Sequence, residues 1–167
     1  MKTTIALLLV CASFLLNNKI NSTDSKITFT FDSEGVAGTI GDIQSQSEID
    51  LTQIEGSIIK GSVSVSSLET GNFLRDGHLM WEKYFNRSDY PRIYFESNSI
   101  KENKDRTYKV EGNLTIKGIS KPVTFLAVKK DNIINITGNI YTSDWNINIQ
   151  KERNKNKATI AMKLKIE

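Results

Sequence analysis

The chain has 167 residues, of which 22 are basic and 19 acidic, with a single histidine and a single cysteine. This length suits one domain with its own hydrophobic core. The net charge of +3, without a basic stripe and interleaved aromatic residues, argues against nonspecific nucleic-acid binding. One cysteine provides neither a disulfide within the chain nor a thiolate metal site.

Residues 1–22 have the features of a secretory signal peptide. Lys2 precedes a short apolar run, which is followed by polar residues. The run is too short to span a bilayer as a helix, which needs about 20 residues. We predict cleavage after Ser22, one domain over residues 23–167, and a periplasmic or secreted location. The alternatives are an uncleaved anchor, a buried N-terminal helix, or a lipid attached to Cys11.

Apolar and polar residues alternate in many short segments after the predicted signal peptide. The clearest segment is 158–166, where every second residue is apolar. A period of two places one set of side chains on an interior face, and turn signals such as Lys117-Gly118 separate the segments. This pattern predicts an antiparallel barrel or sandwich. The positions expected to face the interior are Phe29, Phe31, Val63, Val65, Phe95, Leu114, Ile116, Phe125, Ile136, Ile147, Ile160, Met162 and Leu164.

Residues 70–86 are the only segment with helical character. Asn72 is suited to cap a first turn, and Gly77 interrupts the pattern, so we expect two short helices or a helix and a turn. The same segment holds Arg75, Asp76 and His78 within four positions.

Several positions expected to face inward carry glycine or alanine: Gly112, Ala127, Gly138 and Ala158. Small residues would leave space for a ligand inside an eight-stranded barrel. They are equally consistent with bulges or closely packed corners.

Particular motifs resemble the YceI-like, polyisoprenoid-binding family. They lie at residues 67–79, which include Arg75-Asp76-Gly77-His78-Leu79, and at residues 38–40, 84–85, 90–97 and 112–123. The resemblance covers essentially all of residues 23–167. It implies an all-β, eight-stranded antiparallel lipocalin-like barrel with one or two short helices around residues 70–86, exported to the bacterial cell envelope.

The resemblance also implies that the barrel holds the tail of a long isoprenoid lipid, either a polyprenyl phosphate or a quinone. The interior positions named above are then the expected contacts of the tail. Two family features are absent here: a His-Ser pair near Phe31-Asp32-Ser33, and an aromatic-Gly-Ile sequence where residues 143–147 read Ser-Asp-Trp-Asn-Ile. Of the properties that the resemblance implies, the preference for a particular head group is therefore the one least supported for this chain.

Four residues are candidates for the rim of the barrel: Arg75, Asp76, His78 and Trp81. Arg75 is suited to hold a phosphate, His78 to donate to a quinone oxygen, and Trp81 to act as a lid. The alternative is that Arg75 and Asp76 fix the rim connection over the barrel.

We expect no catalysis, because no nucleophile elbow accompanies the single histidine, and we expect no metal and no cofactor other than the lipid ligand. Basic residues at 151–157 predict either a transient contact with a membrane surface or a solvated turn. The function expected is binding, sequestration or transport of the lipid. The alternative is an envelope stress or interaction protein whose barrel is packed solid. The oligomeric state is open, with a homodimer among the options.

Overall fold

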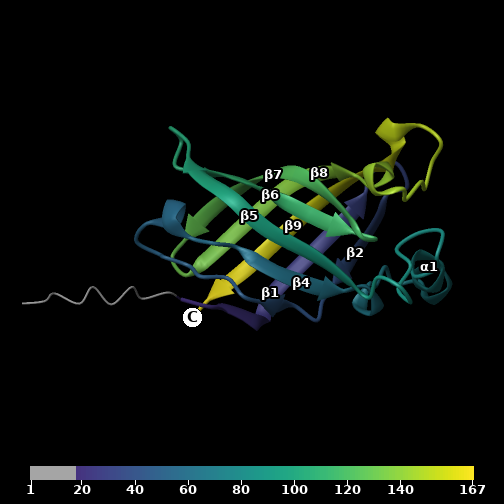
Figure 1. Ribbon diagram of the computed structural model, residues 1–167, viewed down its shortest axis with the longest axis horizontal. Helices are drawn as coiled ribbons and strands as arrows, with labels where there is room; N and C mark the ends of the chain where they lie inside the picture. The colour runs from purple at the N-terminus through teal and green to yellow at the C-terminus, as the bar shows by residue number, and fades with distance from the viewer. Residues whose placement is uncertain (1–17) are drawn as a thin grey trace, which may run out of the picture.

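The computed structural model describes residues 18–167, so most of the predicted signal peptide, including Cys11, lies outside the described residues. One antiparallel sheet curls around a common interior, with a helical connection at one end (Figure 1). This confirms the all-β, lipocalin-like architecture. The strands are β1 (Ile20–Phe31), β2 (Val36–Ile40), β3 (Gln44–Ser45), β4 (Lys60–Ser64), β5 (Arg92–Glu102), β6 (Tyr108–Ile116), β7 (Ile119–Lys130), β8 (Ile133–Tyr141) and β9 (Lys157–Ile166).

The sheet has nine strands where eight were expected, in the order β2-β1-β9-β8-β7-β6-β5-β4-β3. The difference arises between residues 36 and 45, where the chain changes partner. β2 pairs with β1, and the two-residue β3 pairs with β4. One run of extended chain is thereby divided into two short strands that form the two edges of the sheet.

The alternation seen in the sequence sets the register of the long strands. In β8 and β9, Ile136 lies opposite Met162 and Ile134 opposite Leu164, so both strands turn their apolar residues to the same face. The hairpin between β6 and β7 turns at Lys117 and Gly118, which have φ values of 51° and 71°. Two consecutive residues with positive φ match the twist of the flanking strands.

The inward-facing glycines are closely packed. A Cβ atom on Gly138 would overlap the ring of Phe125, and one on Gly112 would overlap the ring of Phe95. These two rings also pack edge to face with their centroids 5.6 Å apart. The glycines therefore make room for phenylalanine rings across the sheet, as the alternative of closely packed corners predicted.

One α-helix, α1 (Phe73–Leu79), lies in the connection between β4 and β5. The Asn72 side chain caps it by accepting a hydrogen bond from the backbone N–H of Arg75 at 3.0 Å. Turns continue the connection through the buried Phe85. Residues 18–167 also contain four short 3₁₀ helices, of which η2 shares the connection of α1: η1 (Ile54–Gly56), η2 (Val65–Ser67), η3 (Thr142–Trp145) and η4 (Arg153–Asn156). Along residues 18–167, no helix is long and apolar enough to cross a bilayer.

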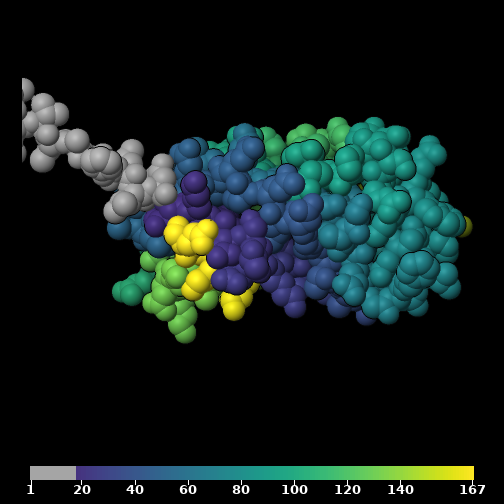
Figure 2. All heavy atoms as spheres, turned by 90° about the horizontal axis from the view of Figure 1, so that it is seen from below, coloured from purple at the N-terminus to yellow at the C-terminus, as the bar shows by residue number. Residues whose placement is uncertain are grey.

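The two ends of the described chain lie side by side, and Figure 2 shows the purple N-terminal residues against the yellow C-terminal ones. Lys19 and Glu167 exchange two backbone hydrogen bonds of 2.9 Å. Ile20 is buried and paired with Ile166. Cleavage after Ser22 would remove these contacts, so the position of cleavage determines whether the start of β1 pairs with the end of β9.

Candidate functional site

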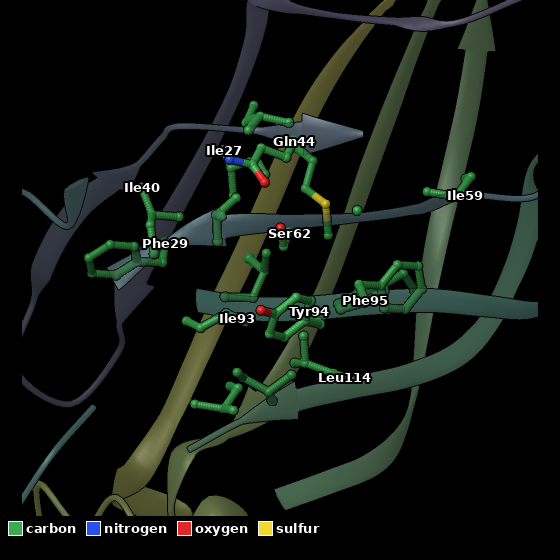
Figure 3. Close-up of a pocket in the computed structure, with 18 of the residues that line it drawn as sticks. Ile27, Phe29, Ile40, Gln44, Ile59, Ser62, Ile93, Tyr94, Phe95 and Leu114 are labelled. Carbon is green, nitrogen blue, oxygen red and sulfur yellow. The ribbon is translucent and has the colours of Figure 1, made fainter. Parts of the chain in front are cut away.

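The interior of the barrel contains an open cavity of about 150 Å³. Figure 3 shows lining side chains that converge on it from several strands, among them Phe29, Ile93, Phe95 and Leu114. Nearly all of the surface that faces the cavity is apolar, although a few serine, glutamine and other polar residues are among those that line it. A cavity of this apolar character suits an apolar ligand.

Some residues around the cavity are less well shielded than the rest of the core. Ile27, Ile160 and Met162 face inward yet are only partly buried, whereas Ile134 and Ile136 on β8 are almost fully buried. Inward-facing side chains retain accessible surface when they border open space instead of packed neighbours. The pattern of exposure therefore supports a real opening in the core.

Most of the interior positions predicted from the sequence line this cavity: Phe29, Phe31, Val63, Phe95, Leu114, Ile116, Phe125, Ile160, Met162 and Leu164. Val65, Ile136 and Ile147 are buried but do not border it. They contribute to the packed part of the core.

One wall of the cavity was not predicted from the sequence; it is formed by residues 43–47 and 59–62. Ile43, Gln44, Ser45 and Ser47 line the cavity from this wall. Serine and glutamine at strand positions obscure the alternation on which the sequence prediction rests. The only available signal was the spacing of Ile43 and Ile49 around polar residues, and it is too weak to place a strand.

Small polar groups accompany this wall, and most of them are hydrogen-bonded internally. The Ser47 hydroxyl donates to the Lys60 carbonyl at 3.0 Å and accepts from the Lys60 N–H at 2.9 Å. The Ser45 hydroxyl donates to that of Ser47 at 2.9 Å. The neighbouring cations also have partners, since Lys60 lies 3.1 Å from Glu96 and Arg92 lies 2.6 Å from Asp42.

Arg75 and Asp76, two of the rim candidates, are both bound to Thr70. The Arg75 side chain donates to the Thr70 hydroxyl at 2.8 Å and to the Thr70 carbonyl at 3.0 Å. The Asp76 carboxylate accepts from the Thr70 N–H at 2.9 Å and from the Thr70 hydroxyl. Neither residue lines the cavity. The geometry is that of a clamp which ties the start of α1 to the chain that precedes it.

His78 and Trp81, the other two rim candidates, are exposed and contact each other. Their ring centroids are 4.4 Å apart and the rings are inclined by 61°. Neither of them lines the cavity. A ligand role for these four rim residues stays a prediction, and it would require contact beyond the cavity lining.

The basic loop at 151–157 is held by acidic neighbours. Arg153 makes two hydrogen bonds to Asp144, of 2.9 and 2.8 Å, and lies over the Tyr141 ring. The Arg153 guanidinium lowers the pKa of Asp144 from its usual value. Lys157 likewise bonds to Asp32 and lowers the pKa of that carboxyl.

Asn156 organises the same loop from a fully buried position. Its amide accepts from the N–H groups of Ile149 and Gln150 at 2.8 and 2.9 Å, and donates to the carbonyls of Gln150 and Glu152, both at 2.8 Å. All of the amide's hydrogen bonds therefore go to the loop backbone. Over residues 18–167, no group of three or more histidine, cysteine, aspartate or glutamate side chains is placed to hold a metal ion.

Comparison with known proteins identifies the family. The model of the YceI-like domain matches residues 19–167. The chain belongs to the YceI-like family. A UPF0312 protein of Azotobacter vinelandii is 29% identical over 90 residues, which are 54% of this chain and 47% of that protein. A UPF0312 protein of Yersinia pestis is 40% identical over 62 residues, which are 37% of this chain and 32% of that protein. The matches thus span at most about half the length of these curated relatives.

Solved structures share the fold of this YceI-like chain. The crystal structure of BcnA from Burkholderia cenocepacia superposes with a TM-score of 0.76 at 18% identity, over 89% of this chain and 99% of that one. The YceI protein of Campylobacter jejuni gives 0.68 at 21% identity, over 79% and 85%. A polyisoprenoid-binding domain of Saccharophagus degradans, implicated in plant cell wall breakdown, gives 0.64 at 14% identity, over 90% and 98%.

Proposed function

We propose that this YceI-like protein binds the hydrocarbon tail of a long isoprenoid lipid in its barrel and sequesters or carries that lipid in the cell envelope. The observation that carries the proposal is the open, apolar cavity inside the barrel. The structural similarity to a polyisoprenoid-binding domain supports it.

Burial of the tail supplies the energy of binding. Each buried CH₂ group contributes roughly 0.8 kcal/mol, so the five carbons of one isoprene unit contribute about 4 kcal/mol, or about 3 kcal/mol once the cost of ordering the chain is subtracted. A few units are enough for stable binding without a polar site. This fits a cavity whose lining is almost entirely apolar.

We propose binding without catalysis. The single histidine, His78, packs against Trp81 at the surface, and the Asp76 carboxylate accepts hydrogen bonds from Thr70. A histidine and a carboxylate that act together in catalysis face one another across a hydrogen bond. The observed contacts serve the connection around α1 instead.

The alternative function was that of a surface-acting protein with a solid barrel. The cavity favours the carrier, because a barrel filled by its own side chains would not leave Ile160 and Met162 partly accessible in the interior. Organic extraction of freshly purified protein, followed by mass spectrometry, tests the proposal. We expect a prenyl lipid in a stoichiometric amount. Repeated recovery of nothing, with no uptake of an added prenol or quinone, would favour the surface-acting protein.

We propose that contact with a membrane, the source of such a lipid, occurs through the exposed tip formed by Phe73, Leu74 and Trp81. Their side chains are 89%, 71% and 61% exposed. Aromatic and aliphatic residues of this kind partition into the interface of a bilayer. Replacing Phe73 and Leu74 with serine should reduce sedimentation with phospholipid vesicles. The same replacement of Leu126 and Val128, exposed on β7, should not. If both double replacements reduced sedimentation equally, the binding would reflect general surface hydrophobicity and not this tip.

We also propose that the protein acts in the periplasm or outside the cell, on the basis of residues 1–22. N-terminal sequencing of the protein from an osmotic-shock fraction tests this. A protein that retains Met1 and stays in the cytoplasmic fraction would contradict it.

A further inference from the structure

The start of the described chain forms a strap across one end of the barrel. This strap, residues 18–21, joins two parts of the wall that are far apart in the sequence. Asn18 exchanges two backbone hydrogen bonds of 2.9 and 3.0 Å with Ile49. Lys19 exchanges two of 2.9 Å with Glu167, just after β9. Figure 1 places the C-terminus, and with it the strap, at the end of the barrel away from α1.

One side chain of the strap, that of Ile20, forms part of the cavity lining. Ile20 is 9% exposed and lies opposite Ile166 of β9. The other strap residues, Asn18, Lys19 and Asn21, are half-buried or exposed and do not line the cavity. Ile20 is thus the strap's apolar contact with the interior. An outward movement of the strap would remove one piece of the cavity wall.

A break in the pairing separates the strap from the rest of β1. Asn21 is paired with Lys165, and the next paired residue, Lys26, with Lys163, so four residues of β1 stand opposite one of β9. The first three residues of this bulge are exposed. The Ser25 hydroxyl accepts a hydrogen bond from the Lys165 N–H at 3.0 Å and anchors the end of the bulge to β9. Because a bulge interrupts the ladder, the strap can leave β9 while the rest of β1 stays paired.

The closure at the other end of the cavity is held by more buried groups. There, the connection that contains α1 covers the cavity with Leu68 and Phe85. The same connection also buries Val65 and Leu79. It therefore has four buried apolar anchors, whereas the strap has Ile20 alone. Local opening is easiest where the fewest apolar contacts are lost, so the strap is the closure that detaches more readily.

We propose that the strap of residues 18–21 is the gate of the lipid cavity. The lipid enters and leaves when the strap detaches from β9, and Ile20 closes over the tail when the strap returns. This inference rests on the proposed function. It also requires that the mature protein keeps residues 18–21, so that the signal peptide is cleaved before Asn18 and not after Ser22. A gate sets the rates of loading and release, whereas the equilibrium affinity depends on the cavity.

A disulfide between the strap and the end of the chain tests the inference. In a Cys11→Ser background, Lys19→Cys with Glu167→Cys places two cysteines at an exposed, hydrogen-bonded pair. The Cα atoms of such a pair are about 5.5 Å apart, which permits a disulfide. We expect the oxidised protein to load and release tritium-labelled farnesol at least about tenfold more slowly than the same protein reduced with dithiothreitol. The Kd should change by less than about twofold, because both rates fall together.

Thr39→Cys with Glu69→Cys is the matched control. These two residues also exchange two backbone hydrogen bonds, of 2.8 and 3.0 Å, and they tie β2 to the connection that contains α1. A disulfide there should leave both rates unchanged.

A second variant tests the gate without a cross-link. Ile20→Ala weakens the hold of the strap and should speed both loading and release about threefold or more. Loss of a ligand contact alone would speed release only. Ile58→Ala is the control, because Ile58 is 44% exposed and does not line the cavity. It should change neither rate.

Equal rates for the oxidised and reduced strap variant would overturn the inference, as would an equal slowing by the control disulfide. An unchanged loading rate in Ile20→Ala would also overturn it. So would a mature protein whose intact mass shows that it begins after Asn21. Failure of the wild-type protein to bind farnesol would instead overturn the proposed function, and this inference with it.

Discussion

Replacing Met162 with tryptophan tests whether the cavity sets the length of the lipid tail. Met162 lines the cavity from β9 and is only partly buried, so a larger side chain there can extend into open space. Tryptophan adds about six non-hydrogen atoms, compared with about five carbons in one isoprene unit. We therefore expect the variant to accommodate about one unit less than the wild-type protein.

The magnitude follows from the burial of one isoprene unit. About 3 kcal/mol per unit corresponds to roughly a hundredfold in Kd. In calorimetric titrations with geraniol, farnesol and geranylgeraniol, the affinity of the wild-type protein should rise with each added unit. In Met162→Trp, the increase should stop about one unit earlier, while geraniol is unaffected.

Leu126→Trp is the matched control, because Leu126 is 44% exposed on β7 and does not line the cavity. It should leave the whole series unchanged. An equal loss of affinity for every prenol in Met162→Trp would point to damage to the fold and refute the reasoning. The reasoning would also be refuted if geranylgeraniol, the longest prenol, bound Met162→Trp as tightly as it binds the wild-type protein.

Three further predictions concern the elements around the cavity. Asn156→Ala should lower the free energy of unfolding by about 2–4 kcal/mol, because it leaves buried backbone groups unpaired. The exposed Asn154→Ala should cost less than about 0.5 kcal/mol in the same urea titration. Asp144→Asn should make the fall of Tm below about pH 4 less steep than in the wild-type protein. The reason is that Arg153 lowers the pKa of Asp144 in the folded protein. The stability contributed by this pair is therefore present above the unfolded pKa of about 3.9 and is lost as the pH falls through the folded pKa. A steeper loss in the variant would contradict that assignment. Arg75→Ala should lower the Tm without changing the ratio of affinities for farnesyl phosphate and farnesol, whereas a selective loss of farnesyl phosphate binding would restore the ligand role predicted from the sequence.

The alternation of apolar residues by itself determined the all-β class and identified ten of the residues that line the cavity. Strand periodicity fixes which face a side chain occupies as soon as one face is buried, so Phe29, Phe95 and Met162 could be assigned to the interior before any fold was known. The helical connection was equally local, because a capping asparagine and a short amphipathic segment are enough to predict it.

Only the tertiary structure decided where that interior is open. Ile136 and Ile160 follow the same alternation, yet Ile136 is packed and Ile160 borders the cavity. The distinction depends on which neighbours approach from other strands. The wall at 43–47 was missed for the same reason. The position of this wall depends on a change of pairing partner, since β2 pairs with β1 whereas β3 pairs with β4. Such long-range pairing produces no alternation of apolar and polar residues around Gln44.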